Sequence, residues 1–367
     1  MVDSLVDKVY NNYNVVNHGG TMEFREVFAQ RFRSARILSG MSLQQLADKI
    51  DNRITKQALS KYEAGLAMPD SKLLILLARE LKVAVEFFFR PVDTSLAITD
   101  IRYRKKSGIS KKALSSALEQ ASEYLERYAV VESLFPATQH YSFTPFLADS
   151  VSDAEEAAEQ LREEWNLGSD PVENLVQILE DRSVKVVQLD NVDKIDAFTG
   201  MAKGARFIAL QQGLPGDRQR STLAHELGHM VYAPDSSADE EKFAYRFSGA
   251  FMAPRQTVLE ELGERRHSLT YPELKNLKKK YGMSMQQWVY RAKDLGIISE
   301  THFREHFIRF NINGKKNEQV EIVTEQPQRL RTLVFRALEE EIIGESRAAE
   351  LLHMSINEVR AEMRVPD

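Results

Sequence analysis

The sequence predicts a mainly α-helical protein with a small β-sheet, an α+β fold divided into several domains. Apolar residues recur at intervals of three and four over much of residues 22–135 and again over 329–363. Only 184–189 and 205–210 have the apolar, β-branched character of strands. At 367 residues the chain exceeds one typical domain. We expect five segments: a flexible leader (1–21), a compact helical domain (22–91), a connector (92–150), an α+β domain (151–310), and a loop with a helical C-terminal region (311–367).

The composition is that of an ordinary globular protein and excludes several classes of function. Hydrophobic residues make up 43% of the chain, charged residues 28%, and the net charge is −5. No apolar run approaches the length of a membrane-spanning helix, and the first residues do not form a secretory signal. The chain has no cysteine, which excludes disulfides, thiolate zinc sites and thiol catalysis. We therefore expect a cytoplasmic protein without a membrane partner.

Residues 22–91 have the pattern of a helix-turn-helix. Phe24, Phe28 and Phe32 recur at helical spacing, and two short helices follow over 42–50 and 55–63. Ser42 is suited to cap the first of these short helices. A strongly apolar helix over 71–81 would support them. Two short helices joined by a tight turn and packed on supporting helices form a helix-turn-helix.

The charge of this segment favours a nucleic-acid partner. It holds 12 Lys and Arg against 8 Asp and Glu, a net charge of +4 within an acidic chain. The helix over 55–63 would present Lys56, Gln57, Ser60 and Lys61 outward, where long polar side chains can reach bases and phosphates in the major groove. A helical protein-interaction module is the alternative on pattern alone.

The segment resembles the XRE (lambda-repressor-like) helix-turn-helix family. The resemblance lies in Leu46-Ala47, in Gln57-x-Leu59-Ser60-x-Tyr62-Glu63-x-Gly65, and in Pro69, Leu81-x-Val83 and Phe87-Phe88-Phe89. It implies binding to a double-stranded DNA operator, with Thr55, Lys56, Gln57 and Lys61 at DNA-contacting positions. The segment departs from the family at two points. Leu43 replaces the usual glutamine at the start of the second helix, which removes one phosphate contact, and the turn at 51–54 is longer than usual, which affects the aim of the recognition helix.

The connector contains a basic run and a long helix. Arg102-Tyr103-Arg104-Lys105-Lys106 is either an additional phosphate contact or a solvated basic turn. Residues 110–135 carry leucines and aromatic residues at helical spacing. This helix either packs between domains or pairs with its copy in a homodimer, and the sequence leaves both open.

The motif His225-Glu226-Leu227-Gly228-His229 points to a metal-dependent hydrolase. Histidines four apart lie on one face of a helix and can converge on one Zn²⁺, with Glu226 placed to accept a proton from the attacking water. Apolar neighbours would bury this helix, and Gly228 would leave room beside the metal. The alternative is a chance grouping of surface residues.

A catalytic zinc needs a third protein ligand. The next acidic cluster is Asp239-Glu240-Glu241, at the start of a second amphipathic helix. Glu241 lies one turn before Ala244, on the face that turns inward, so we predict Glu241 as the ligand and Glu240 as the runner-up. The alternative is that these acids only stabilise the N-terminus of the helix.

The wider domain resembles the ImmA/IrrE family of metallopeptidases. The matching residues are Trp165-x-Leu167-Gly168, Pro171, the run from Asp217 to His229, and Glu241-x-x-Ala244-x-x-Phe247. The resemblance implies a zincin-like domain with Zn²⁺ held by His225, His229 and Glu241 and with Glu226 as general base. It also implies cleavage of repressor or antitoxin-like proteins. Tyr245 departs from the family's asparagine, and Gln211 or Gln212 stands where an asparagine is common at the second strand's end.

The C-terminal region offers two interpretations. Residues 311–328 predict a polar loop, and 345–355 have the pattern of half a helix-turn-helix, although a helical cap on the peptidase domain is the preferred interpretation. His302 and His306 are spaced as ligands but have no acidic helix beside them, so we predict surface histidines.

The sequence therefore predicts a DNA-binding transcriptional regulator that carries a zinc-dependent endopeptidase, with an activity that could be held latent. Its expected substrate is a repressor or antitoxin-like protein in a stress or mobile-element response. Tyr232, Tyr245 and Arg218 are candidates for stabilising the oxyanion. One alternative is a transcription factor or antitoxin whose peptidase-like domain is a non-catalytic sensor or dimerisation module. Another is a helix-turn-helix that recruits a similar repressor as substrate instead of DNA.

Overall fold

The computed structural model describes residues 24–51, 53–92, 96–103, 109–136, 141–312 and 320–364. The expected leader lies outside these residues. The chain forms two compact units: residues 1–97 with 108–126, and residues 98–107 with 127–367. Among the described residues, none of the helices is long and apolar enough to cross a membrane.

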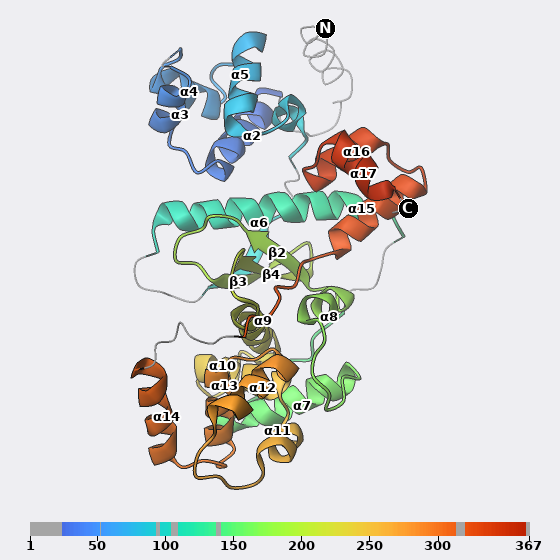
Figure 1. The fold of residues 1–367 in the computed structure, drawn as a ribbon. Coiled ribbons are helices and arrows are strands. Elements are labelled where there is room, and N and C mark those ends of the chain that lie inside the picture. Colours follow the sequence, from blue (N-terminus) through green and yellow to red (C-terminus); the bar gives the residue numbers. More distant parts are fainter. Residues whose placement is uncertain are drawn as a thin grey trace. The chain divides into compact units, whose positions relative to one another are not determined.

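The first unit contains the predicted helices. They are α2 (Phe24–Leu38), α3 (Leu43–Lys49), α4 (Lys56–Glu63) and α5 (Ser71–Leu81), followed by the 3-10 helix η1 (Val85–Phe89) (Figure 1). Ser42 caps α3 as expected, because its side chain accepts a hydrogen bond from the Gln45 N–H. The core is aromatic: the rings of Phe28, Phe32 and Phe88 are completely buried and pack on one another.

The long helix predicted over 110–135 is α6 (Lys111–Glu132), and its first part belongs to the first unit. Arg31 of α2 donates a hydrogen bond to Glu126 Oε2 at 2.7 Å, and Arg90 donates to the same oxygen at 2.9 Å. Arg90 also pairs with Glu123. A buried ion network therefore ties α6 to the helix-turn-helix.

The second unit contains a four-stranded sheet in the order β1-β3-β4-β2. The predicted strands are β2 (Lys185–Leu189) and β4 (Ala205–Gln211), which pair in parallel. Two further strands, β1 (Ile98–Tyr103) and β3 (Ala197–Ala202), pair antiparallel to each other and are not predicted from the sequence. A Cβ on Gly200 of β3 would lie 2.8 Å from the Phe207 ring, so this strand carries a glycine where pattern analysis expects a bulky residue.

Strand β1 changes the interpretation of the connector. Residues 98–103 were expected to link two domains, yet they form an edge of the peptidase-like sheet. The described part of the basic run, Arg102-Tyr103, therefore lies in a strand and not in a turn. Residues 104–106 of that run lie outside the described residues.

Helices surround the sheet in the second unit. Helix α9 (Gly216–Val231) packs against β3 and β4, and α10 (Glu240–Met252) packs against α9 and α7 (Ala154–Glu164) (Figure 1). The core is continuous across these elements and includes the fully buried rings of Phe243, Phe247 and Trp288. The remaining helices of this region are α8 (Leu175–Asp181), α11 (Arg255–Leu262), α12 (Tyr271–Tyr281), α13 (Met285–Asp294) and α14 (Glu300–Ile312).

The C-terminal region is helical as predicted: α15 (Arg329–Glu339), α16 (Glu345–Leu352) and α17 (Ile356–Met363). The described part of the expected loop, 320–328, has no regular structure but is anchored, because buried Glu325 accepts hydrogen bonds from Arg220 and from the Val176 N–H. The prediction of surface histidines was wrong for His306. It is 5% exposed, and its ring accepts from the Leu269 N–H.

Candidate metal centre

Helix α9 places both histidines of the motif on one buried face. His225 is 6% exposed and His229 is 9% exposed. Because four residues make about one helical turn, the two rings lie one above the other, with their Nε2 atoms 3.2 Å apart. Two imidazole nitrogens this close together could both bind one metal ion.

Glycine 228 allows the helix that carries the third candidate ligand to approach. A Cβ on Gly228 would lie 3.0 Å from the Ala244 Cα and 3.1 Å from Phe247 Cδ1. From the sequence, this glycine is expected to leave room beside the metal. The structure shows that it leaves room for α10, because a side chain there would press against the backbone of that helix.

The close packing of α9 and α10 brings Glu241 to the two histidines. Its carboxylate oxygens lie 3.7 Å from His225 Nε2 and 3.5 Å from His229 Nε2. Bonds of 2.0–2.2 Å to a tetrahedral Zn²⁺ separate neighbouring ligand atoms by about 3.4 Å. The spacing and the nitrogen–oxygen donor set therefore fit zinc. Among the described residues, this trio is the one group of three or more potential ligands that could hold a metal ion.

Glu240, the runner-up as third ligand, contacts the outer nitrogen of His229, Nδ1. Its Oε1 lies 2.9 Å from His229 Nδ1, whereas the candidate ligand atom of that ring is Nε2. The helix-capping role considered for these acids belongs to Asp239, whose side chain accepts from the Lys242 N–H at 3.0 Å. That backbone hydrogen bond is the main reason why the pKa of Asp239 is lowered.

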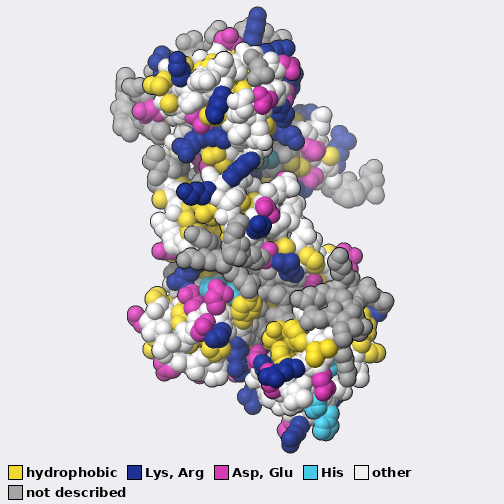
Figure 2. Space-filling model, turned by 90° about the vertical axis from the view of Figure 1, so that its left-hand side faces the viewer, with side chains coloured by type: hydrophobic (Ala, Val, Ile, Leu, Met, Phe, Trp, Pro, Cys, Tyr) yellow, Lys and Arg dark blue, Asp and Glu magenta, His cyan; other side chains and the backbone are white. Residues whose placement is uncertain are grey.

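The predicted general base, Glu226, is also on α9 and is only 4% exposed. The mouth of the site is open, since the Glu240 and Glu241 side chains are 40% and 50% exposed. Figure 2 shows acidic side chains gathered beside a small histidine surface on this face. The arrangement combines a buried candidate base with one candidate ligand, Glu241, that solvent can reach.

The three oxyanion candidates differ in what they contact. The Tyr232 hydroxyl lies within hydrogen-bond distance of the backbone carbonyls of Ser236 and Ala238, and its single proton can be donated to either, which holds the loop before α10. Arg218 is paired with Asp196 at 2.7 Å. The Tyr245 ring lies 4.4 Å from the His225 ring, centroid to centroid, and its side chain is 47% exposed. The geometry therefore favours Tyr245.

Arg102 is a further residue at this site, and its contacts are not predicted from the sequence. From β1, its Nη1 donates to Glu240 Oε1 at 2.8 Å and to the His229 carbonyl at 3.1 Å. These partners lie more than 120 residues away along the chain, and no local motif predicts such a contact.

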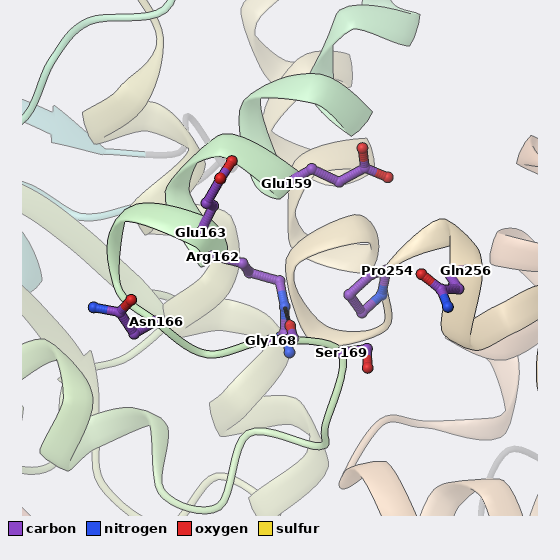
Figure 3. A pocket seen from close by; sticks show the side chains of 8 residues that line it. All are labelled: Glu159, Arg162, Glu163, Asn166, Gly168, Ser169, Pro254 and Gln256. Carbon is purple, nitrogen blue, oxygen red and sulfur yellow. Dashed lines mark hydrogen bonds between the residues drawn. The ribbon is translucent and has the colours of Figure 1, made fainter.

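A cavity of about 620 Å³ lies elsewhere in this unit and includes none of the candidate ligands (Figure 3). Its wall includes Arg162, whose guanidinium donates to the carbonyls of Gly168 and Phe251. Burial lowers the pKa of Arg162 to about 10. This side chain anchors a loop to the end of α10, so the cavity does not identify a second catalytic site.

In the first unit, all five predicted DNA-contacting residues are exposed at the start and along one face of α4: Thr55, Lys56, Gln57, Ser60 and Lys61. Leu59 and Tyr62, on the opposite face, are buried. Thr55 also caps the helix, since its hydroxyl accepts from the Ala58 N–H at 3.2 Å. The face is therefore available to a partner.

Comparisons with known proteins match both units. The helix-turn-helix family model matches residues 32–88, and the model of the IrrE N-terminal-like domain, a peptidase family, matches residues 179–293. A relative in Bacillus subtilis (strain 168), the SPbeta prophage-derived uncharacterized HTH-type transcriptional regulator YonR, is 31% identical over 99 residues. The match covers 27% of this chain and 90% of that protein.

The fold and the matches define a DNA-binding regulator with an added metallopeptidase-family domain. The chain belongs to the helix-turn-helix family of transcriptional regulators, of the XRE type, and carries an IrrE/ImmA-like domain. The latter family is zincin-like, in agreement with the His225–His229–Glu241 group.

Proposed function

We propose that the second unit is a zinc-dependent endopeptidase that cleaves a repressor or antitoxin-like protein in a stress or mobile-element response. The observation that carries the proposal is the convergence of His225, His229 and Glu241 at distances suited to one Zn²⁺. Glu226, which follows the first histidine on the same helix, completes the set of groups needed for hydrolysis.

Each residue has a distinct role in this reaction. His225, His229 and Glu241 would hold Zn²⁺, which when bound supplies Lewis-acid activation of the scissile carbonyl and of water. Glu226 accepts a proton from the attacking water on its carboxylate and later delivers it to the leaving nitrogen. We assign Tyr245, whose ring lies beside that of His225, to stabilising the negative charge that develops on the carbonyl oxygen.

Two observations support a polypeptide substrate and its class. Among the described strands, β1 lies at one edge of the sheet, and an extended peptide can add as a further strand to a sheet edge. β1 also carries Arg102, which contacts the candidate metal centre. The prophage origin stated in the relative's name supports a role in mobile-element control.

In the first unit, we assign operator binding to the exposed face of α4. Lys56 and Lys61 would contact phosphates, while Gln57, Ser60 and Thr55 would lie toward base edges or the sugar–phosphate backbone. The net charge of +4 over residues 22–91 supports this role.

The cleavage proposal is tested with peptides prepared from a digested proteome and analysed by mass spectrometry. Zinc-loaded wild type should cut a defined set of bonds, whereas Glu226→Gln should bind zinc normally and cut none of them. Glu260→Gln, at an exposed position on α11, is the matched control and should behave as wild type. If zinc-loaded wild type cuts nothing, with or without duplex DNA, the domain is better explained as a non-catalytic sensor or dimerisation module.

A further inference from the structure

We propose that Arg102 is a positioning residue for the metal centre, acting through Glu240 on His229. The inference rests on the proposed metal site. It assigns a role to a residue of the short strand β1, in a stretch that sequence analysis treated as a connector.

One carboxylate oxygen links the arginine to the histidine. Glu240 Oε1 lies 2.8 Å from Arg102 Nη1 and 2.9 Å from His229 Nδ1. A carboxylate on Nδ1 favours the tautomer that carries its proton there, which leaves the Nε2 lone pair directed at the candidate metal position. Arg102 therefore holds the Glu240 carboxylate in the position from which it orients the His229 ring.

The same arginine nitrogen also binds the end of the helix that carries the ligands. Arg102 Nη1 donates to the His229 carbonyl at 3.1 Å, and this carbonyl belongs to the last turn of α9. Carbonyls in the last turn have no partner within the helix and favour a nearby cation. The guanidinium of Arg102 thus fixes the backbone of His229 directly and fixes its ring through Glu240.

An irregularity in β1 aims the arginine at this site. Thr99 pairs with Met201 and Arg102 pairs with Thr199, so β1 spans one residue more than β3 over this interval. Asp100, inside the interval, has a φ of 50°. An extra residue of this kind turns the following side chains toward a different face, and it presents Arg102 to α9 and α10.

The effect should appear in metal binding more than in stability. Arg102 and Glu240 are 42% and 40% exposed, and an ion pair with this exposure contributes little to folding. Two further charged groups interact electrostatically near Arg102. The pKa of Arg206 is lowered by burial and then by the charge of Arg102, whereas the charge of Asp100 raises it. Removal of Arg102 would leave Glu240 free to turn away from Nδ1.

The test measures the zinc dissociation constant of the full chain by competition with a chromogenic chelator. Arg102→Ala should weaken zinc binding about 10-fold, as found for outer partners of metal-binding histidines. Glu240→Gln should weaken it similarly, and the double variant should lose less affinity than the sum of the two single losses, because both side chains act on His229 and the direct contact of Arg102 with the His229 carbonyl is lost only once. Arg102→Lys, which keeps the charge but not the two-way contact, should lie between wild type and Arg102→Ala.

Arg336→Ala is the control, since it removes an arginine–carboxylate pair of similar exposure on α15. The Co²⁺ absorption spectrum should change in Arg102→Ala but not in Arg336→Ala. Wild-type zinc affinity in Arg102→Ala, or additive losses in the double variant, would overturn this inference alone. Failure of wild type to bind zinc would overturn the proposed function as well.

Discussion

Glu240 and Glu241 are adjacent carboxylates that contact different nitrogens of the same imidazole. Glu240 lies against His229 Nδ1, and Glu241 lies against His229 Nε2. The difference follows from the helix, because consecutive residues project about 100° apart. The two neighbouring glutamates are therefore suited to different roles. Glu241 can bind the candidate metal, whereas Glu240 can hold the outer nitrogen of His229.

Gly228 determines how closely α10 can approach α9. In Gly228→Ala the new Cβ would meet the α10 backbone at 3.0 Å, so α10 must move and carry Glu241 away from the histidines. We expect a loss of about 1–3 kcal/mol in unfolding free energy and weaker zinc binding. Gly344→Ala is the matched control, because a Cβ there meets nothing within 4 Å. Unchanged zinc affinity in Gly228→Ala would mean that the approach of α10 does not determine the site.

At the scale of elements, helix α4 is the part whose function is most directly testable. Lys61→Ala should weaken binding to random-sequence duplex DNA and reduce the slope of log K against log salt by about 0.9, the value for one lost phosphate contact. Lys72→Ala, an exposed lysine on α5, is the control. Equal salt slopes for wild type and Lys61→Ala would show that Lys61 does not contact a DNA phosphate, and would favour a protein partner for this face of α4.

The elements also show how far the sequence predicts the fold. Helices with strong periodicity and caps, such as α3 with Ser42 and α4 with Thr55, were predicted close to their observed ends. Strands β2 and β4 were predicted from their apolar runs, whereas β1 and β3 were not. β3 contains Gly200, and β1 contains an irregularity, so neither has a regular alternation of side chains.

The same distinction applies to the candidate site. The motif on α9 and the inward position of Glu241 depend on spacing within single helices, which the sequence contains. The pairing of Arg102 with Glu240 joins residues 138 positions apart and depends on a strand that local pattern does not reveal. Contacts within an element were therefore predictable, and contacts between distant elements were not.

At the scale of the whole molecule, the chain combines a helix-turn-helix with a metallopeptidase-family domain, and its two units interleave in sequence. Residues 98–107 belong to the second unit, while the segments before and after them belong to the first. The strand that contributes Arg102 to the candidate metal centre is thus covalently flanked on both sides by the DNA-binding unit. This connectivity gives a physical reason to measure zinc binding and DNA binding on the full chain.

The proposed metal centre is tested by the zinc content per chain at saturating, buffered zinc, in wild type, Glu241→Gln and Glu240→Gln. We predict one zinc per wild-type chain and one in Glu240→Gln, because Glu240 contacts only the outer nitrogen of His229. Glu241→Gln should lose this zinc, because a candidate ligand is removed. Absence of zinc from metal-replete wild type, or full retention in Glu241→Gln, would contradict the proposed metal centre.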